Sequence, residues 1–126
     1  MRDFRKLKIW QRSHNLTLDV YKTTANFPKE ERYGLTSQLR RACASVPTNI
    51  AEGSAMSSDR EFARYVEIAA GSASETEYLL FLARDLRIIA EESHQTLASE
   101  VTQLRKMLNT FKRRLDDRSS DEPPTT

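Results

Sequence analysis

Apolar residues recur at alternating steps of four and three along most of the chain, which is the spacing of one buried face of an α-helix. In residues 33–53 this apolar stripe consists of Leu35, Leu39, Ala42, Val46, Ile50 and Gly53. A polar stripe runs beside it, about a quarter-turn away around the helix: Gln38, Arg41, Ser45, Asn49 and Glu52. A helix that only covered a core would not need a second stripe of regularly spaced polar side chains. We therefore predict that the polar stripe lies at a helix seam or subunit interface, with Glu75 as a candidate partner for Arg41.

The same periodicity predicts four helices joined by short loops, over residues 8–25, 35–53, 59–89 and 94–117. Four amphipathic helices with short connections make an antiparallel up-down four-helix bundle the economical fold, so we predict an all-α domain over residues 1–118. Residues 119–126 hold no apolar side chain and two prolines, which predicts a disordered tail.

Two of these helices carry features that a simple core helix would lack. Pro47 removes one amide donor and crowds the carbonyl of Cys43, so we predict a kink, with the Ser45 hydroxyl available to the freed backbone group. The third helix carries two apolar stripes and is apolar nearly all round over residues 79–89, which predicts a subunit interface rather than a broader core contact. Gly71, in its middle, costs roughly 1 kcal/mol relative to Ala, which predicts close packing against another backbone.

The composition fits a single domain with one core. The 126 residues are 38% hydrophobic and 30% charged, with 3 Gly and 4 Pro, which favours helices over a turn-rich β fold. The single cysteine excludes an internal disulfide framework, and the chain has no N-terminal apolar run of signal length and no apolar span long enough to cross a membrane. We therefore expect a cytoplasmic protein without a membrane partner.

The net charge of +2 favours no particular partner, but basic residues gather near both ends of the predicted bundle. Residues 1–12 hold five Lys or Arg against one Asp, and residues 93–118 hold six against three acids, whereas residues 13–92 hold nine against twelve. Charged helix faces also serve solubility alone. If these faces bind phosphates, the candidate contacts are Arg2, Arg5, Lys6, Lys8, Arg12, Arg40, Lys106 and Arg113.

The sequence holds no pattern typical of an enzyme. A di-iron bundle needs two Glu-x-x-His pairs on facing helices, and the chain has one such spacing, Glu91 with His94, at a predicted turn. Cys43 has no histidine near it in sequence and no glycine-rich elbow around it, so we interpret it as a small buried hydrophobe. There is no glycine-rich phosphate loop and no Ser/His/Asp constellation. We expect no catalytic residue, no bound metal and no cofactor.

Three motifs cover residues 7 to about 87: LKIWQRSHNL, FPKEERYGLTSQLRRACASVPTNIAEG and SDREFARYVEIAAGSASETEYLL. In this order they resemble the four-helix-bundle family first known from proteins encoded within intervening sequences of bacterial 23S ribosomal RNA genes. The stretch from Gly34 to Gly53 is the most specific part, because it combines paired arginines, serine-x-proline and asparagine-isoleucine-alanine-glutamate-glycine in the family's order. One departure is Thr76, where the family usually has an apolar residue.

The resemblance implies a homo-oligomer, commonly a pentameric ring of bundles, without known enzymatic activity. It extends to the accessory variability proteins of diversity-generating retroelements, which are similar pentamers that bind nucleic acid and a reverse transcriptase. Two functions stay open at this point. The first is a non-enzymatic oligomer that binds RNA or DNA through its basic faces. The alternative is a protein adaptor, such as an accessory subunit that binds a reverse transcriptase or another partner.

Overall fold

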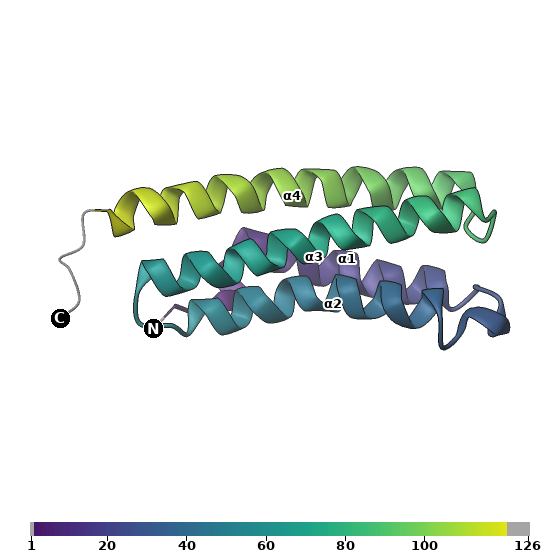
Figure 1. Cartoon of the computed structure of the whole chain (residues 1–126), viewed down its shortest axis with the longest axis horizontal. Coiled ribbons are helices and arrows are strands. Elements are labelled where there is room, and N and C mark those ends of the chain that lie inside the picture. Colours follow the sequence, from purple (N-terminus) through teal and green to yellow (C-terminus); the bar gives the residue numbers. More distant parts are fainter. Residues whose placement is uncertain (1, 121–126) are drawn as a thin grey trace.

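The computed structural model describes residues 2–120, and these residues form four long helices (Figure 1). The helices are α1 (Lys8–Thr24), α2 (Leu35–Ser54), α3 (Asp59–Asp85) and α4 (Glu91–Ser119). Two short 3₁₀ turns, η1 (Phe4–Lys6) and η2 (Lys29–Glu31), precede α1 and α2. The described residues contain no strand, so the predicted all-α fold is confirmed, and residues 121–126 of the predicted tail lie outside the described part.

The helices pack around one another in chain order. Figure 1 shows the connections at alternate ends of the bundle, and each helix contacts the next one along the chain. α4 also packs against α1, although this contact is the least extensive of the four. Within residues 2–120, the backbones of α1 and α3 do not approach each other closely, and neither do those of α2 and α4. The side of the bundle formed by α1 and α4 therefore lies opposite the side formed by α2 and α3.

The core consists of the apolar stripes that the periodicity predicts. Every member of the α2 stripe is buried. In α4 the same alternation of four and three is followed by Phe111, which is half-buried, and by five buried residues: Leu97, Val101, Leu104, Leu108 and Leu115. Complete burial of a side chain such as Phe62 of α3 stabilises the fold by roughly 1.5–3 kcal/mol. α2 and α3 approach each other closely at Gly53, because a Cβ there would lie 2.7 Å from atoms of Phe62 and Tyr65.

The third helix ends earlier than the sequence predicts, at Asp85 rather than at residue 89. The Ile88 amide donates a hydrogen bond to the Ala83 carbonyl at 2.9 Å, and Arg87 between them has a positive φ of 58°. This 6→1 hydrogen bond and the left-handed conformation of Arg87 form a Schellman motif, which ends the helix. Glycine usually occupies the left-handed position. Because an arginine stands there instead, the sequence carries no stop signal.

Pro47 does not interrupt α2, which continues through it. The carbonyl of Cys43 loses its helical partner to the proline, and the group nearest to replace it is the Thr17 hydroxyl of α1 at 3.4 Å, which has a closer acceptor in the Ser13 carbonyl at 2.8 Å. The role predicted for Ser45 in this position is therefore wrong. Ser45 instead hydrogen-bonds Ser72 of α3, with 2.8 Å between the two hydroxyl oxygens.

Candidate nucleic-acid interface

A groove of about 430 Å³ lies between α1 and α4, and we name it the basic groove. Three cations line it: Lys8 from the first turn of α1, and Lys106 and Arg114 from α4. The other lining residues are Ile9, Met107, Thr110 and Phe111, and no acidic side chain is among them. The groove therefore combines an uncompensated positive rim with a largely apolar floor, which suits an anion that also carries an apolar group.

The spacing of residues along α4 explains this composition. Every fourth position on one side of the helix lines the groove: Lys106, Thr110 and Arg114. Met107 and Phe111 lie between that side and the buried face, and both are half-buried. Phe111 packs edge-on against Phe62, with ring centroids 5.4 Å apart, and Ile9 of α1 is 3% exposed. The floor is thus held in place by the core before any ligand binds.

The same two helices form a second hollow farther along their contact, of about 460 Å³, which we name the mixed hollow. It is lined by Asp19, Lys22 and Thr23 of α1 and by Glu92, Ser93, Thr96 and Leu97 of α4. Two carboxylates stand there with one ammonium group. Between the two hollows, Arg12 of α1 pairs with Glu100 of α4 at 3.2 Å. The contact of α1 with α4 therefore has a basic end, a compensated middle and a mixed end.

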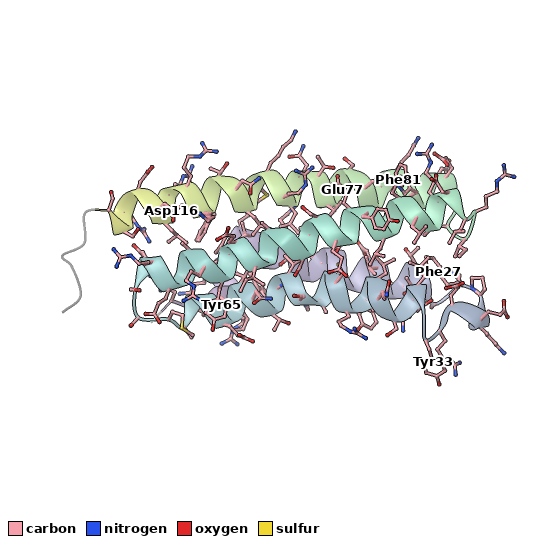
Figure 2. The ribbon with its side chains drawn as sticks, viewed as in Figure 1. Phe27, Tyr33, Tyr65, Glu77, Phe81 and Asp116 are labelled. Carbon is pink, nitrogen blue, oxygen red and sulfur yellow. The ribbon has the colours of Figure 1, made fainter. Side chains whose placement is uncertain are left out.

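A third hollow, of about 670 Å³, runs along α2 from Thr36 to Thr48 and is completed by Tyr21 of α1 and by Arg32 and Tyr33, and we name it the arginine hollow. Its cations are Arg32, Arg40 and Arg41, and no acid lines it. Arg40 stacks on the Tyr21 ring at 4.6 Å and donates to the Thr24 hydroxyl at 2.8 Å and the Tyr21 carbonyl at 3.2 Å. Tyr33 at its edge is 89% exposed and projects away from the bundle (Figure 2). This hollow is a second cationic surface.

Arg2, one of the predicted phosphate contacts, is held at the end of the bundle by Asp59 at the start of α3. It also donates to the Met56 carbonyl at 3.0 Å. The two carboxylate oxygens of Asp59 accept hydrogen bonds from Arg118 of α4 at 2.9 and 3.0 Å. The hydrogen bonds from Arg118 and Arg2 hold the pKa of Asp59 below its ordinary value. We name this cluster the Asp59 clasp, and it compensates part of the charge of both arginines.

The remaining predicted phosphate contacts differ in whether a carboxylate compensates them. Arg5 pairs with Asp3 at 3.3 Å, and Arg12 is in the ion pair described above. Lys6 and Arg113 are exposed, and neither forms an ion pair within the described part of the chain. Solvent-exposed cations without a partner are the ones that can neutralise phosphates at the lowest cost.

The structure brings two of the predicted contacts, Lys8 and Lys106, together in the basic groove and adds Arg114 to them. No sequence argument singled out Arg114. Its spacing from Lys106, about two helical turns, was a usable signal, because it places both residues on one side of α4. Phe111 both packs on the core and lines the groove.

Only the middle of the polar stripe of α2 lies at a helix seam within the chain. Besides the Ser45–Ser72 contact, the Asn49 amide donates to the Ser45 carbonyl and hydroxyl at 2.8 and 3.0 Å. The other predicted members are exposed: Gln38, Arg41 and Glu52 on α2, and Glu75 on α3. Arg41 and Glu75 form no ion pair with each other within residues 2–120, so this pairing stays a prediction.

The outer face of α3 exposes large apolar side chains. Ile68, Tyr78 and Leu86 are 53%, 59% and 53% exposed, and Phe81, labelled in Figure 2, is 49% exposed. Gly71 is also exposed, and a Cβ built on it would meet nothing within 4 Å. The close packing predicted at Gly71 is therefore not made within the chain. We name Ile68, Gly71, Tyr78 and Leu86 the α3 outer face.

The described residues offer little catalytic chemistry. Burial raises the pKa of the Cys43 thiol to about 11, so the sulfur stays protonated near neutral pH and is a poor nucleophile. His94 is buried at the start of α4. Within residues 2–120 no three His, Cys, Asp or Glu side chains are grouped so that they could hold a metal ion. None of the described helices has the length and apolar character that a membrane span requires.

Comparison with known proteins gives one family and one fold. The sequence profile of the family described as 23S rRNA-intervening sequence protein matches residues 5–110. A solved structure from Bacteroides thetaiotaomicron VPI-5482, described as a protein with unknown function from the S23 ribosomal protein family, is similar with a TM-score of 0.75 at 24% identity. The similarity covers 82% of this chain and 97% of that chain, and it supports the fold alone. No curated protein matches the chain.

Proposed function

Because the chain belongs to the family of 23S rRNA-intervening sequence proteins, we propose that it is a non-enzymatic, cytoplasmic nucleic-acid-binding protein that works as a homo-oligomer of antiparallel bundles. The observation that carries this proposal is the basic groove, where Lys8, Lys106 and Arg114 stand without an acid. Each phosphate that a Lys or Arg neutralises releases counterions, so a cluster of such cations favours a polyanion. Arg113, exposed on α4, extends the cationic surface beyond the rim.

The ligand of these cations is RNA or DNA, bound first through its backbone. Contacts to phosphates set affinity and position but carry no base sequence. The arginine hollow provides a second site of the same sign, because Arg32, Arg40 and Arg41 line it without an acid. Arginine binds phosphate oxygens through its planar fork of donors, and the Tyr33 ring beside it is free to stack on a base.

Assembly of several copies would join modest cationic surfaces into a strong one. The α3 outer face supports self-association, because Gly71 costs roughly 1 kcal/mol in a helix and gains no packing within its own chain. Exposed Ile68 and Tyr78 beside it supply apolar area for a second copy. No residue of α3 lines the basic groove, so self-association through this face leaves the lining residues of the groove free to bind a ligand. A pentamer, which the family resemblance implies, would raise avidity without new contacts.

Binding of the purified protein to labelled single-stranded RNA and duplex DNA, measured by fluorescence anisotropy across salt concentrations, tests the function. We expect affinity that falls steeply with salt, and a gentler dependence in Lys106→Ala/Arg113→Ala. Lys22→Ala, on the same two-helix contact but in the mixed hollow, is the matched control and should leave the slope unchanged. No binding at low salt by protein shown to be folded and oligomeric would contradict the proposal.

Self-association is tested separately by native mass spectrometry and light scattering. We expect Ile68→Asp/Tyr78→Asp to dissociate the oligomer, because two carboxylates would be buried without partners. Leu18→Asp/Tyr21→Asp, which changes two exposed apolar residues of α1 in the same way, is the control and should leave the mass unchanged. Retention of the oligomer in the α3 variant would show that copies meet through another surface.

A protein adaptor is the second candidate, and the exposed apolar end of α3 favours it. Phe81 and Leu86 are about half exposed there. A partner such as a reverse transcriptase would bury these side chains. A reverse transcriptase gene beside this one, and complex formation between the two purified proteins that Phe81→Asp abolishes, would support the adaptor function. If the folded oligomer binds nucleic acid but does not bind a reverse transcriptase encoded beside it, nucleic-acid binding is supported and the adaptor function is not.

A further inference from the structure

We propose that the basic groove receives one unpaired base of a single-stranded nucleic acid, with the base on the apolar floor and its flanking phosphates on the cationic rim. This inference rests on the proposed nucleic-acid-binding function and names the class of strand that the site takes. It goes beyond phosphate binding because it assigns a role to side chains without charge, Met107 and Phe111 above all.

The positions of the cations fit a strand that follows α4. Lys106 and Arg114 are eight positions apart on the helix, which is about 12 Å along its axis. Lys8 stands on the opposite wall, on α1. A strand along the groove therefore meets positive charge on both sides and no lining carboxylate. An acidic peptide would also satisfy the rim, but it offers no flat group to the floor.

The floor has the chemistry that binds the face of a base. Phe111 is half-buried and fixed against Phe62 at 5.4 Å, so its ring is positioned without a ligand. Met107 beside it is flexible and polarizable, and such side chains pack well on aromatic rings. Stacking of a base on an aromatic side chain tolerates any base, because every base has a π face. The volume of about 430 Å³ falls in the range of roughly 300–1,000 Å³ typical of small-molecule sites.

The concave shape of the groove separates single strands from duplexes. In a duplex the bases are stacked inside and present only their edges in the grooves, while the phosphates lie outside. A duplex can therefore contact the rim but cannot place a base face on Met107 or Phe111. Bases of a single strand can leave the stack and enter the groove. The site should thus bind single strands more tightly than duplexes, by the binding free energy that one stacked base contributes.

Substitution of the floor tests this preference. We expect Met107→Ala to weaken binding of oligothymidine by roughly 2- to 10-fold, the range for loss of one contact between a methionine and an aromatic ring, with duplex affinity and the salt slope unchanged. Met107→Leu, which keeps an apolar floor, is the matched control and should retain most of the single-strand affinity. Equal losses for single strand and duplex in Met107→Ala would overturn the inference.

A second probe needs no variant and so does not depend on how Met107→Ala folds. An abasic strand with the same number of phosphates as oligothymidine should bind the unaltered protein more weakly by at least this factor, because it loses the contacts of the base with both Met107 and Phe111, and its salt slope should be the same. Equal affinity for the two strands would overturn base insertion, yet a steep salt slope would still support the proposed function. If neither strand nor duplex binds at low salt, the proposed function itself fails and the inference falls with it.

Discussion

The two ends of the contact between α1 and α4 are built from the same helices and carry opposite chemistry. The basic groove has three cations, no acid and a largely apolar floor. The mixed hollow has a similar volume but holds Asp19 and Glu92 with Lys22. The Arg12–Glu100 ion pair, at 3.2 Å, separates them. The uncompensated charge of the basic groove would attract a polyanion, and neither the net charge of +2 nor the count of basic residues reveals this local charge.

Reversing the charge of the basic end should have the largest effect. Lys106→Glu/Arg114→Glu removes two phosphate contacts and adds repulsion, so we expect affinity for single-stranded RNA to fall on the order of 100-fold at low salt. Lys22→Glu/Lys29→Glu makes the same change in net charge away from the groove and should shift affinity by no more than about threefold. Anisotropy titrations measure both. Equal losses in the two variants would show that overall charge, rather than the groove, attracts the ligand.

Converting the mixed hollow into a basic one should strengthen binding. Asp19→Lys/Glu92→Lys extends the positive surface along the α1 and α4 contact, and we expect affinity to rise about tenfold with a steeper salt slope. The slope reports the number of phosphates contacted, by about 0.7 per contact for a single strand. A rise in affinity without a change of slope would argue against a strand that follows the whole contact.

Breaking the Arg12–Glu100 ion pair, between the two hollows, should have a smaller effect on the affinity for nucleic acid. Glu100→Gln releases Arg12 from its ion pair, and we expect affinity to rise about threefold. Both side chains are more than a third exposed, so the free energy of unfolding should change by less than about 1 kcal/mol. Arg12→Ala/Glu100→Gln should return affinity to the original value. A gain that persists in this double variant would not come from Arg12.

A change in the Asp59 clasp should have the smallest effect on nucleic-acid binding. Its effect on the stability of the fold should appear at acidic pH. The lowered pKa of Asp59 means that the clasp stabilises the fold fully above the ordinary carboxyl value of 3.8 and that this stability is lost as pH falls through the lowered value. Asp59→Asn should lower the free energy of unfolding by ~1 kcal/mol at neutral pH. On acidification, the free energy of unfolding of this variant should fall less than that of the original protein. Thermal melts at several pH values measure this, with exposed Asp117→Asn as the control.

The helices could be predicted from the sequence because each core stripe is local information. The buried stripe of α4, from Leu97 to Leu115, follows from spacing alone. The end of α3 could not be predicted, because Arg87 stands in the left-handed position where glycine is the usual signal. Two predicted cations, Lys8 and Lys106, do meet in one groove. The compensation of Arg2 by Asp59 depends on residues far apart in the chain, and no local pattern shows it.

Ultraviolet cross-linking of a uridine-rich single strand, followed by mapping of the modified peptides, tests whether the basic groove binds nucleic acid. If the basic groove binds nucleic acid, cross-links should concentrate on residues 106–114 of α4 and on the start of α1, and should disappear from both in Lys106→Glu/Arg114→Glu. Cross-links concentrated on residues 92–97 of the mixed hollow, or on the α3 outer face, with the basic groove unmodified, would contradict the account.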